Sequence, residues 1–200
     1  GGDYFEFIPL PDERWGIIIA DVVGKGIGAA LLVSAMRASL YALVGRELAV
    51  RAVMRRANRF FYDSVEESRY VTLFYAVLDV PSRRMIYVNA GHQPPVVLRE
   101  NGEIEMLESG GVPLGMFEAP RYFEGFVALD QGDLTVLYTD GIVESSDAHD
   151  EHYGRDRLVT RLGSVRTESA DAICRHVMDD VRNFSFGSQD DRTLVVLKAT

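Results

Sequence analysis

The sequence of 200 residues is poor in cysteine, because Cys174 is the single one. One cysteine excludes an internal disulfide bond and any multi-cysteine zinc site. The four histidines are dispersed along the chain and do not have the spacing of a zinc site either. A protein without disulfides suits a reducing compartment better than secretion, so we expect a cytoplasmic protein.

Long hydrophobic runs and positive charge are also scarce. The longest apolar candidate, residues 29–44, is interrupted by Ser34, Arg37 and Ser39, so the sequence predicts no membrane span of about 18 residues. Lys and Arg total 21 against 30 Asp and Glu, a net charge of −9. Because nucleic-acid binding depends on cations that neutralise phosphates, we expect no nucleic-acid partner. The acidic balance fits carboxylates gathered around metal ions, and equally a surface made acidic for solubility.

The apolar pattern predicts many strands interrupted by helices. The predicted strands are 4–10, 14–23, 70–79, 84–90, 94–99, 104–107, 122–128, 134–138 and 193–198. Helices are predicted from Ala29 onward, at about 48–64, at 155–162 and after a capping Ser169. In the first helix, one broad face from Leu31 to Leu43 is expected to be buried, and strands 122–128 and 134–138 are expected to pair. We therefore predict one α+β domain over residues 1–200, a central antiparallel β-sandwich flanked by helices.

Aspartates stand at the ends of several predicted strands: Asp3, Asp21, Asp140 and the Asp190–Asp191 pair. A carboxylate at the edge of a buried strand is costly unless something compensates its charge. Oxygen-coordinated Mg²⁺ or Mn²⁺ would remove the repulsion among such carboxylates. The alternative is that each aspartate only caps a turn, which suits Asp3 and Asp191 better than Asp21 and Asp140.

Three other features have competing interpretations. The sequence Gly24-x-Gly26-x-x-Ala29 resembles a relaxed dinucleotide fingerprint, but a second helix follows where that fold needs a strand. His92, in a tight loop, is a weak candidate for positioning a substrate phosphate, and we favour a loop hydrogen-bonding role. The arginines at 51, 55, 56 and 59 are most simply a solvated helix face, with partner docking as the alternative.

Five segments occur in the order expected of one family. They are Gly1-Gly2-Asp3-Tyr4-Phe5-Glu6, Ala20-Asp21-Val22-Val23-Gly24-Lys25-Gly26, Asn89-Ala90-Gly91-His92-Gln93-Pro94-Pro95, Tyr138-Thr139-Asp140-Gly141-Ile142-Val143-Glu144 and Asp190-Asp191-Arg192-Thr193. Together they resemble the PPM-type metal-dependent serine/threonine phosphatases, in the bacterial SpoIIE/RsbU-like branch. Residues 111–115 also resemble a loop of that branch.

The resemblance implies a metal centre at one end of the β-sandwich. Asp21 resembles the carboxylate that bridges two Mn²⁺ or Mg²⁺ ions, and the Val22 carbonyl resembles a further ligand. Asp140 and Asp190 resemble the other main ligands, and Asp3 an acidic residue that acts directly or through water. The family allows a third ion, and the residues expected to be catalytic are Asp21 and Asp140.

The implied reaction is hydrolysis of phosphoserine or phosphothreonine by direct attack of a metal-activated water. The implied substrate is a phosphorylated anti-sigma-factor antagonist of the STAS type. We also expect a regulatory domain upstream, because the chain begins without Met, with the helices over 29–64 as a switch. The alternative is a catalytically weak or inactive module that binds a regulatory protein. The general acid is left open, since Val23 stands where some relatives carry a histidine. The oligomeric state is also left open.

Overall fold

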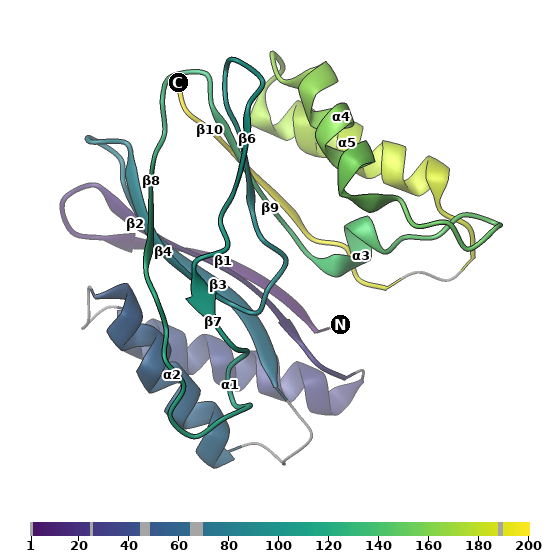
Figure 1. Ribbon diagram of the computed structural model, residues 1–200. Helices are drawn as coiled ribbons and strands as arrows, with labels where there is room; N and C mark the ends of the chain where they lie inside the picture. The colour runs from purple at the N-terminus through teal and green to yellow at the C-terminus, as the bar shows by residue number, and fades with distance from the viewer. Residues whose placement is uncertain (1, 25, 45–48, 65–69, 188–189) are drawn as a thin grey trace. The chain divides into compact units, whose positions relative to one another are not determined.

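The computed structural model describes residues 2–24, 26–44, 49–64, 70–187 and 190–200. The chain divides into two compact units, the first comprising Gly1–Pro94 with Leu107–Leu129 and the second Pro95–Met106 with Asp130–Thr200. Each unit has its own sheet, its own helices and its own hydrophobic core (Figure 1).

The first unit is built on a six-stranded sheet, mostly antiparallel, in the order β1-β2-β3-β4-β7, with β8 also paired to β4. Its strands are β1 (Asp3–Leu10), β2 (Arg14–Val22), β3 (Val71–Asp79), β4 (Arg84–Ala90), β7 (Gly110–Gly111) and β8 (Gly125–Ala128). Residues 16–20 of β2 are all buried, as their uninterrupted apolar character predicted. The sequence had treated 109–115 as loop, whereas the two residues of β7 pair in parallel with β4.

Helices α1 (Ile27–Val44) and α2 (Val50–Ser64) lie along this sheet (Figure 1). Met36 and Leu40 of α1 and Phe61 of α2 are fully buried in the core that the helices form with the strands. The predicted burial of Leu31 is wrong, because this side chain is 66% exposed. Leu31 lies two residues after the buried Ala29, about 200° around the helix, and so points away from the core.

Helix α1 also corrects the prediction about apolar length. Its 18 residues are long and apolar enough, by length and composition alone, to cross a membrane, although it contains Arg37. It is the one such helix among the described residues, and a single candidate is weak evidence for a span. In the structure α1 packs against α2, β1 and β2, and it buries Ala29, Met36, Leu40 and Val44.

The second unit has a four-stranded antiparallel sheet in the order β10-β9-β5-β6. Its elements are β5 (Val96–Leu98), β6 (Ile104–Met106), β9 (Leu134–Tyr138), α3 (Asp140–Val143), α4 (Gly154–Val165), α5 (Ala170–Phe184) and β10 (Leu194–Lys198). The core of this unit joins apolar residues of α4 and α5 to the sheet. The predicted cap is confirmed, because the Ser169 side chain accepts a hydrogen bond from the N–H of Ala172.

The predicted pairing of strands 122–128 and 134–138 is wrong. Strand β8 pairs with β4 in the first unit, whereas β9 pairs with β5 and β10 in the second. The turn between them does form, with the N–H of Asp133 donating to the Asp130 carbonyl at 3.1 Å. The Asp133 side chain of this turn binds the β5–β6 hairpin, and β9 does not return to pair with β8.

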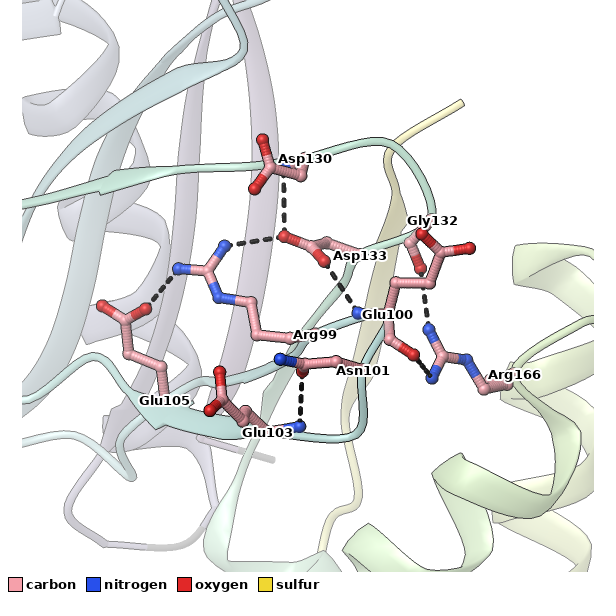
Figure 2. Close-up of polar contacts among 9 residues, drawn as sticks. All are labelled: Arg99, Glu100, Asn101, Glu103, Glu105, Asp130, Gly132, Asp133 and Arg166. Atoms are coloured by element: carbon pink, nitrogen blue, oxygen red, sulfur yellow. Dashed lines mark hydrogen bonds and ion pairs between the residues drawn. The ribbon is translucent and has the colours of Figure 1, made fainter.

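Asp133 is the centre of that attachment (Figure 2). Its carboxylate is 2% exposed and accepts from Arg99 Nη1 at 2.6 Å. It also accepts from the backbone N–H groups of Glu100 and Asp130, each at 3.0 Å. Arg99 in turn pairs with Glu105 on β6. The buried charge is therefore fully bonded, and the cluster holds the hairpin to the start of β9.

Candidate metal centre

Two of the predicted ligands meet in the first unit. Asp3 and Asp21 are directly opposite each other in the β1–β2 ladder, and both are partly buried. Like charges directly opposite in a sheet repel. A divalent cation beside this pair would replace the repulsion with attraction.

Gly2 packs closely against the same pair. A Cβ atom at residue 2 would lie 2.5 Å from the Val22 carbonyl oxygen and 2.8 Å from Asp21 Oδ1. The two oxygens are therefore close neighbours, and only a residue without a side chain can pack against them at position 2. The N–H of Val22 donates to the Gly2 carbonyl at 3.2 Å and holds the two strands in this arrangement.

The donor set at this point fits the metal that the sequence predicts. A carboxylate and a backbone carbonyl are hard oxygen ligands, of the kind that Mg²⁺ and Mn²⁺ prefer. Asp21 and Val22 are the two neighbouring residues that the sequence assigned as ligands. The part of the site in the first unit is therefore suited to hold a divalent cation.

The second unit brings the other two predicted ligand segments together. Asp140 does not end a strand, as the sequence had suggested, but begins α3 immediately after β9. Asp190 precedes β10, is exposed, and accepts a hydrogen bond from the N–H of Asp191 at 3.0 Å. Because β9 and β10 are antiparallel neighbours, the end of one lies beside the start of the other.

Short contacts fix this second pair of segments. The N–H of Thr139 donates to the Thr193 carbonyl at 3.1 Å, and the N–H of Thr193 donates to Thr139 Oγ1 at 2.9 Å. A Cβ atom at Gly141 would lie 1.9 Å from the Asp191 carbonyl oxygen. Glycine is therefore required at 141 for the two segments to approach this closely.

The structure thus gathers the predicted ligands as two pairs, Asp3 with Asp21 and Asp140 with Asp190. Over the described ranges, it gathers no group of three or more His, Cys, Asp or Glu side chains that could hold a metal ion. The union of both pairs in one four-carboxylate site, and the roles of its members, stay predictions.

His92 lies in the first unit and is 5% exposed. Its N–H donates to Asn89 Oδ1 at 2.8 Å, and its carbonyl accepts from Asn89 Nδ2 at 3.1 Å. Its Nδ1 lies 3.0 Å from Thr72 Oγ1, and Thr72 is the register partner of Asp21 on β3. These are the contacts of a residue that shapes its loop next to the β2 end, whereas a role in binding substrate stays a prediction.

Asn58 is a structural residue that sequence reasoning missed. It is 1% exposed on α2, and its amide donates to the carbonyls of Phe117 and Glu118 at 2.9 and 3.2 Å. Its Oδ1 accepts from the N–H of Gly115 at 3.0 Å. The one available signal was an asparagine on the otherwise apolar face of a predicted helix, since a buried amide needs partners.

Two side chains, Tyr4 and Cys174, have raised pKa values, and neither can act as an ionised group at physiological pH. Burial and the neighbouring Glu6 carboxylate raise the pKa of Tyr4 to about 12, so its phenol is neutral at physiological pH. Burial also raises the pKa of Cys174, which keeps the thiol protonated. A protonated thiol is a poor nucleophile, so the second unit offers no activated cysteine here.

Comparison with known proteins identifies relatives over the whole chain. The family described as Stage II sporulation protein E (SpoIIE) matches residues 11–200. Phosphoserine phosphatase RsbU of Bacillus subtilis is 30% identical over 199 residues, which cover 98% of this chain and 59% of the relative. Phosphoserine phosphatase RsbP of the same organism is 30% identical over 147 residues, or 72% of this chain and 36% of the relative. The chain therefore spans less than two thirds of these relatives.

Solved structures show the fold. The SiaA-PP2C domain of Pseudomonas aeruginosa superposes with a TM-score of 0.86 at 17% identity, covering 100% of this chain and 81% of that one. The PP2C phosphatase domain of SpoIIE from Bacillus subtilis gives 0.83 at 19% identity, covering 98% and 57%. RsbX, solved in complex with magnesium, gives 0.70 at 16% identity, covering 98% and 85%. The predicted fold class is confirmed as a mixed α+β, PP2C-like fold with two sheets and flanking helices.

Proposed function

This chain belongs to the SpoIIE family of PP2C-type phosphatase domains, and from that premise we propose that it is a metal-dependent protein phosphatase. The proposed reaction is hydrolysis of a phosphoserine or phosphothreonine in another protein. Homology to the phosphoserine phosphatases RsbU and RsbP supports this reaction class.

One observation of the structure carries the proposal. The Val22 carbonyl oxygen and Asp21 Oδ1 would lie 2.5 and 2.8 Å from a Cβ at residue 2, so a backbone oxygen and a carboxylate oxygen are close neighbours at the start of β1. A glycine that serves only a turn would not need to place a carboxylate and a carbonyl within reach of one point. A cation site explains all three residues together.

In the proposed site, Asp21 and Val22 hold a divalent cation, Mn²⁺ or Mg²⁺, with Asp3 opposite. Asp140 and Asp190 supply the remaining carboxylates, and Asp21 and Asp140 are the proposed catalytic residues. When bound, such cations stabilise the charge of the transferred phosphoryl group and lower the pKa of the attacking water. The magnesium in the RsbX structure supports a metal of this class.

We further propose that the substrate is the phosphorylated STAS-type antagonist of an anti-sigma factor, as in partner-switching pathways. The resemblance to the SpoIIE/RsbU-like branch and the 30% identity to RsbU support this choice. A regulatory domain attached to the chain would set its activity, since RsbU extends well beyond the matched region.

The test is phosphatase activity on p-nitrophenyl phosphate and on a phosphoserine peptide during a Mn²⁺ titration, with Asp21→Asn compared to the wild type. We expect Asp21→Asn to lose at least about 100-fold in activity, because metal ions contribute several kcal/mol of transition-state stabilisation. Asp150→Asn is the matched control. Asp150 is exposed with φ of 60°, a conformation that asparagine tolerates equally well.

Near wild-type turnover by Asp21→Asn, with the fold verified by circular dichroism, would contradict the metal mechanism. A wild-type chain that binds Mn²⁺ but hydrolyses neither substrate would instead support the inactive binding module.

A further inference from the structure

A groove of about 540 Å³ lies between α2 and the segment 118–123, both in the first unit. It contains none of the predicted metal ligands. Residues that line it include Arg51, Arg55, Arg59, Arg121, Tyr122 and Phe123. We refer to it as the α2 groove.

Positive charge is concentrated in the α2 groove, although the chain carries a net charge of −9. Arg51, Arg55 and Arg121 are exposed, and their guanidinium groups form no ion pair with another described residue. Arg59 differs, because it pairs with Asp63 at 2.9 Å and with Glu118 at 3.1 Å. Three guanidinium groups therefore face the groove with their charge available to a ligand.

The stability of α2 does not explain these charges. Arg51 and Arg55 are four residues apart, where like charges destabilise a helix. The first turn of α2 contains Arg51 and no acid, and the last turn contains Asp63 and no base, which opposes the helix dipole. Glu124 already accepts a hydrogen bond from the N–H of Arg51 at 3.0 Å, so the start of the helix needs no further anion.

The opposite wall of the groove, the segment 118–123, is anchored to α2 and includes aromatic side chains. Tyr122 is 3% exposed, and its hydroxyl donates to Asn58 Oδ1 at 3.3 Å. Asn58 also binds the carbonyls of Phe117 and Glu118, which holds this segment on α2. Next to Tyr122, the ring of Phe123 is 63% exposed at the groove. A fixed wall with an exposed ring offers an apolar contact beside the arginines.

We propose that the α2 groove binds an acidic peptide segment of a partner protein. Carboxylates of the segment pair with Arg51, Arg55 and Arg121, since guanidinium groups bind carboxylates through two parallel hydrogen bonds. An apolar side chain of the segment packs against Phe123. A concave site with an aromatic wall suits a peptide better than a flat lipid surface, and the net charge of the chain repels long polyanions such as nucleic acid.

The test measures binding of a fluorescein-labelled peptide, Glu-Asp-Glu-Phe-Asp-Glu, to the full chain by fluorescence anisotropy. The neutral peptide Gln-Asn-Gln-Phe-Asn-Gln is the ligand control. We expect Arg55→Glu with Arg121→Glu to weaken binding of the acidic peptide by about tenfold or more, and high salt to weaken it in the wild type. The matched control is Arg83→Glu with Arg84→Glu, which makes the same charge change on the exposed β3–β4 turn and should leave binding unchanged.

If the glutamate variant does not fold, Arg55→Gln with Arg121→Gln replaces it and is expected to show the same direction of change. Three results would overturn the proposal: equal binding of the two peptides, an equal loss in the control variant, or no binding of the acidic peptide. Tighter binding of phosphatidylserine vesicles or of an oligonucleotide, lost in the groove variant, would also overturn it. The measurement uses no metal and no turnover, so the phosphatase proposal stands or falls separately.

Discussion

At residue 2, a hydrogen atom in place of a side chain lets the chain pack closely against Asp21 and Val22, the proposed metal ligands. The approach is close enough that even a methyl group would touch both oxygens. Gly2 therefore belongs to the proposed site through its close packing, although it contributes no ligand atom of its own.

Gly2→Ala is expected to raise the Mn²⁺ concentration needed for half-maximal activity by at least about tenfold, since a 1.4 kcal/mol loss of binding has that effect. The added Cβ would stand 2.8 Å from Asp21 Oδ1 and displace it or the metal. Activity against Mn²⁺ concentration measures the shift.

Gly163→Ala is the control for this change. Gly163 lies within α4, and a Cβ there would meet nothing within 4 Å. This substitution should stabilise the helix by about 0.5–1 kcal/mol and leave the Mn²⁺ dependence unchanged. An unchanged Mn²⁺ dependence in Gly2→Ala would show that the close packing at residue 2 does not serve a metal site.

Residues of two kinds differ in how far sequence predicts them. Asp21 and Asp140 are conspicuous because each is a carboxylate that follows a strongly apolar run and comes shortly before a glycine. The roles of Gly2 and Asn58 depend on segments that are distant in sequence and approach only in the folded chain. The local amino-acid sequence does not show which distant segments come together, so neither role could be predicted.

At the scale of elements, ion pairs and backbone hydrogen bonds attach the β5–β6 hairpin to its neighbours (Figure 2). Asp133 binds Arg99 and the N–H of Glu100 from one side. From α4, Arg166 donates to the Glu100 carbonyl at 2.6 Å and to the Gly132 carbonyl at 3.3 Å. The second unit therefore joins its hairpin, its 130–133 turn and the end of α4 through polar contacts.

Asp133→Ala is expected to reduce the free energy of unfolding by about 3 kcal/mol, because it leaves the guanidinium of Arg99 without its buried partner. Chemical denaturation followed by circular dichroism measures the loss. Asp130→Ala is the control, since Asp130 enters the cluster through its backbone N–H, which alanine retains. Equal stability of the two variants would contradict the role given to the Asp133 carboxylate.

The strands β1 to β6 follow from apolar patterns and turn signals, and their positions were predicted, whereas the pairing of β2 with β3 was not. The partner of β8 was not predicted either, because a turn signal such as residues 130–133 says where the chain bends but not which strand it pairs with. Strand β8 pairs with β4, and the Asp133 side chain of the turn binds the β5–β6 hairpin. Helix α3 is only four residues long, too short to show a helical period.

At the scale of the whole molecule, the order of five motifs carried more information than any element. The resemblance they gave predicted the PP2C-like fold, which the solved structures confirm. The chain places its proposed ligands as one pair in each of two compact units. We predict that these two pairs serve one metal centre.

The most direct measurement is an anomalous difference map from a crystal grown with Mn²⁺. We predict peaks within about 2.1 Å of the Asp21 carboxylate and the Val22 carbonyl oxygen, with Asp140 and Asp190 completing the same coordination sphere. A map with no peak beside Asp21, or with Asp140 and Asp190 facing away from it, would contradict the account.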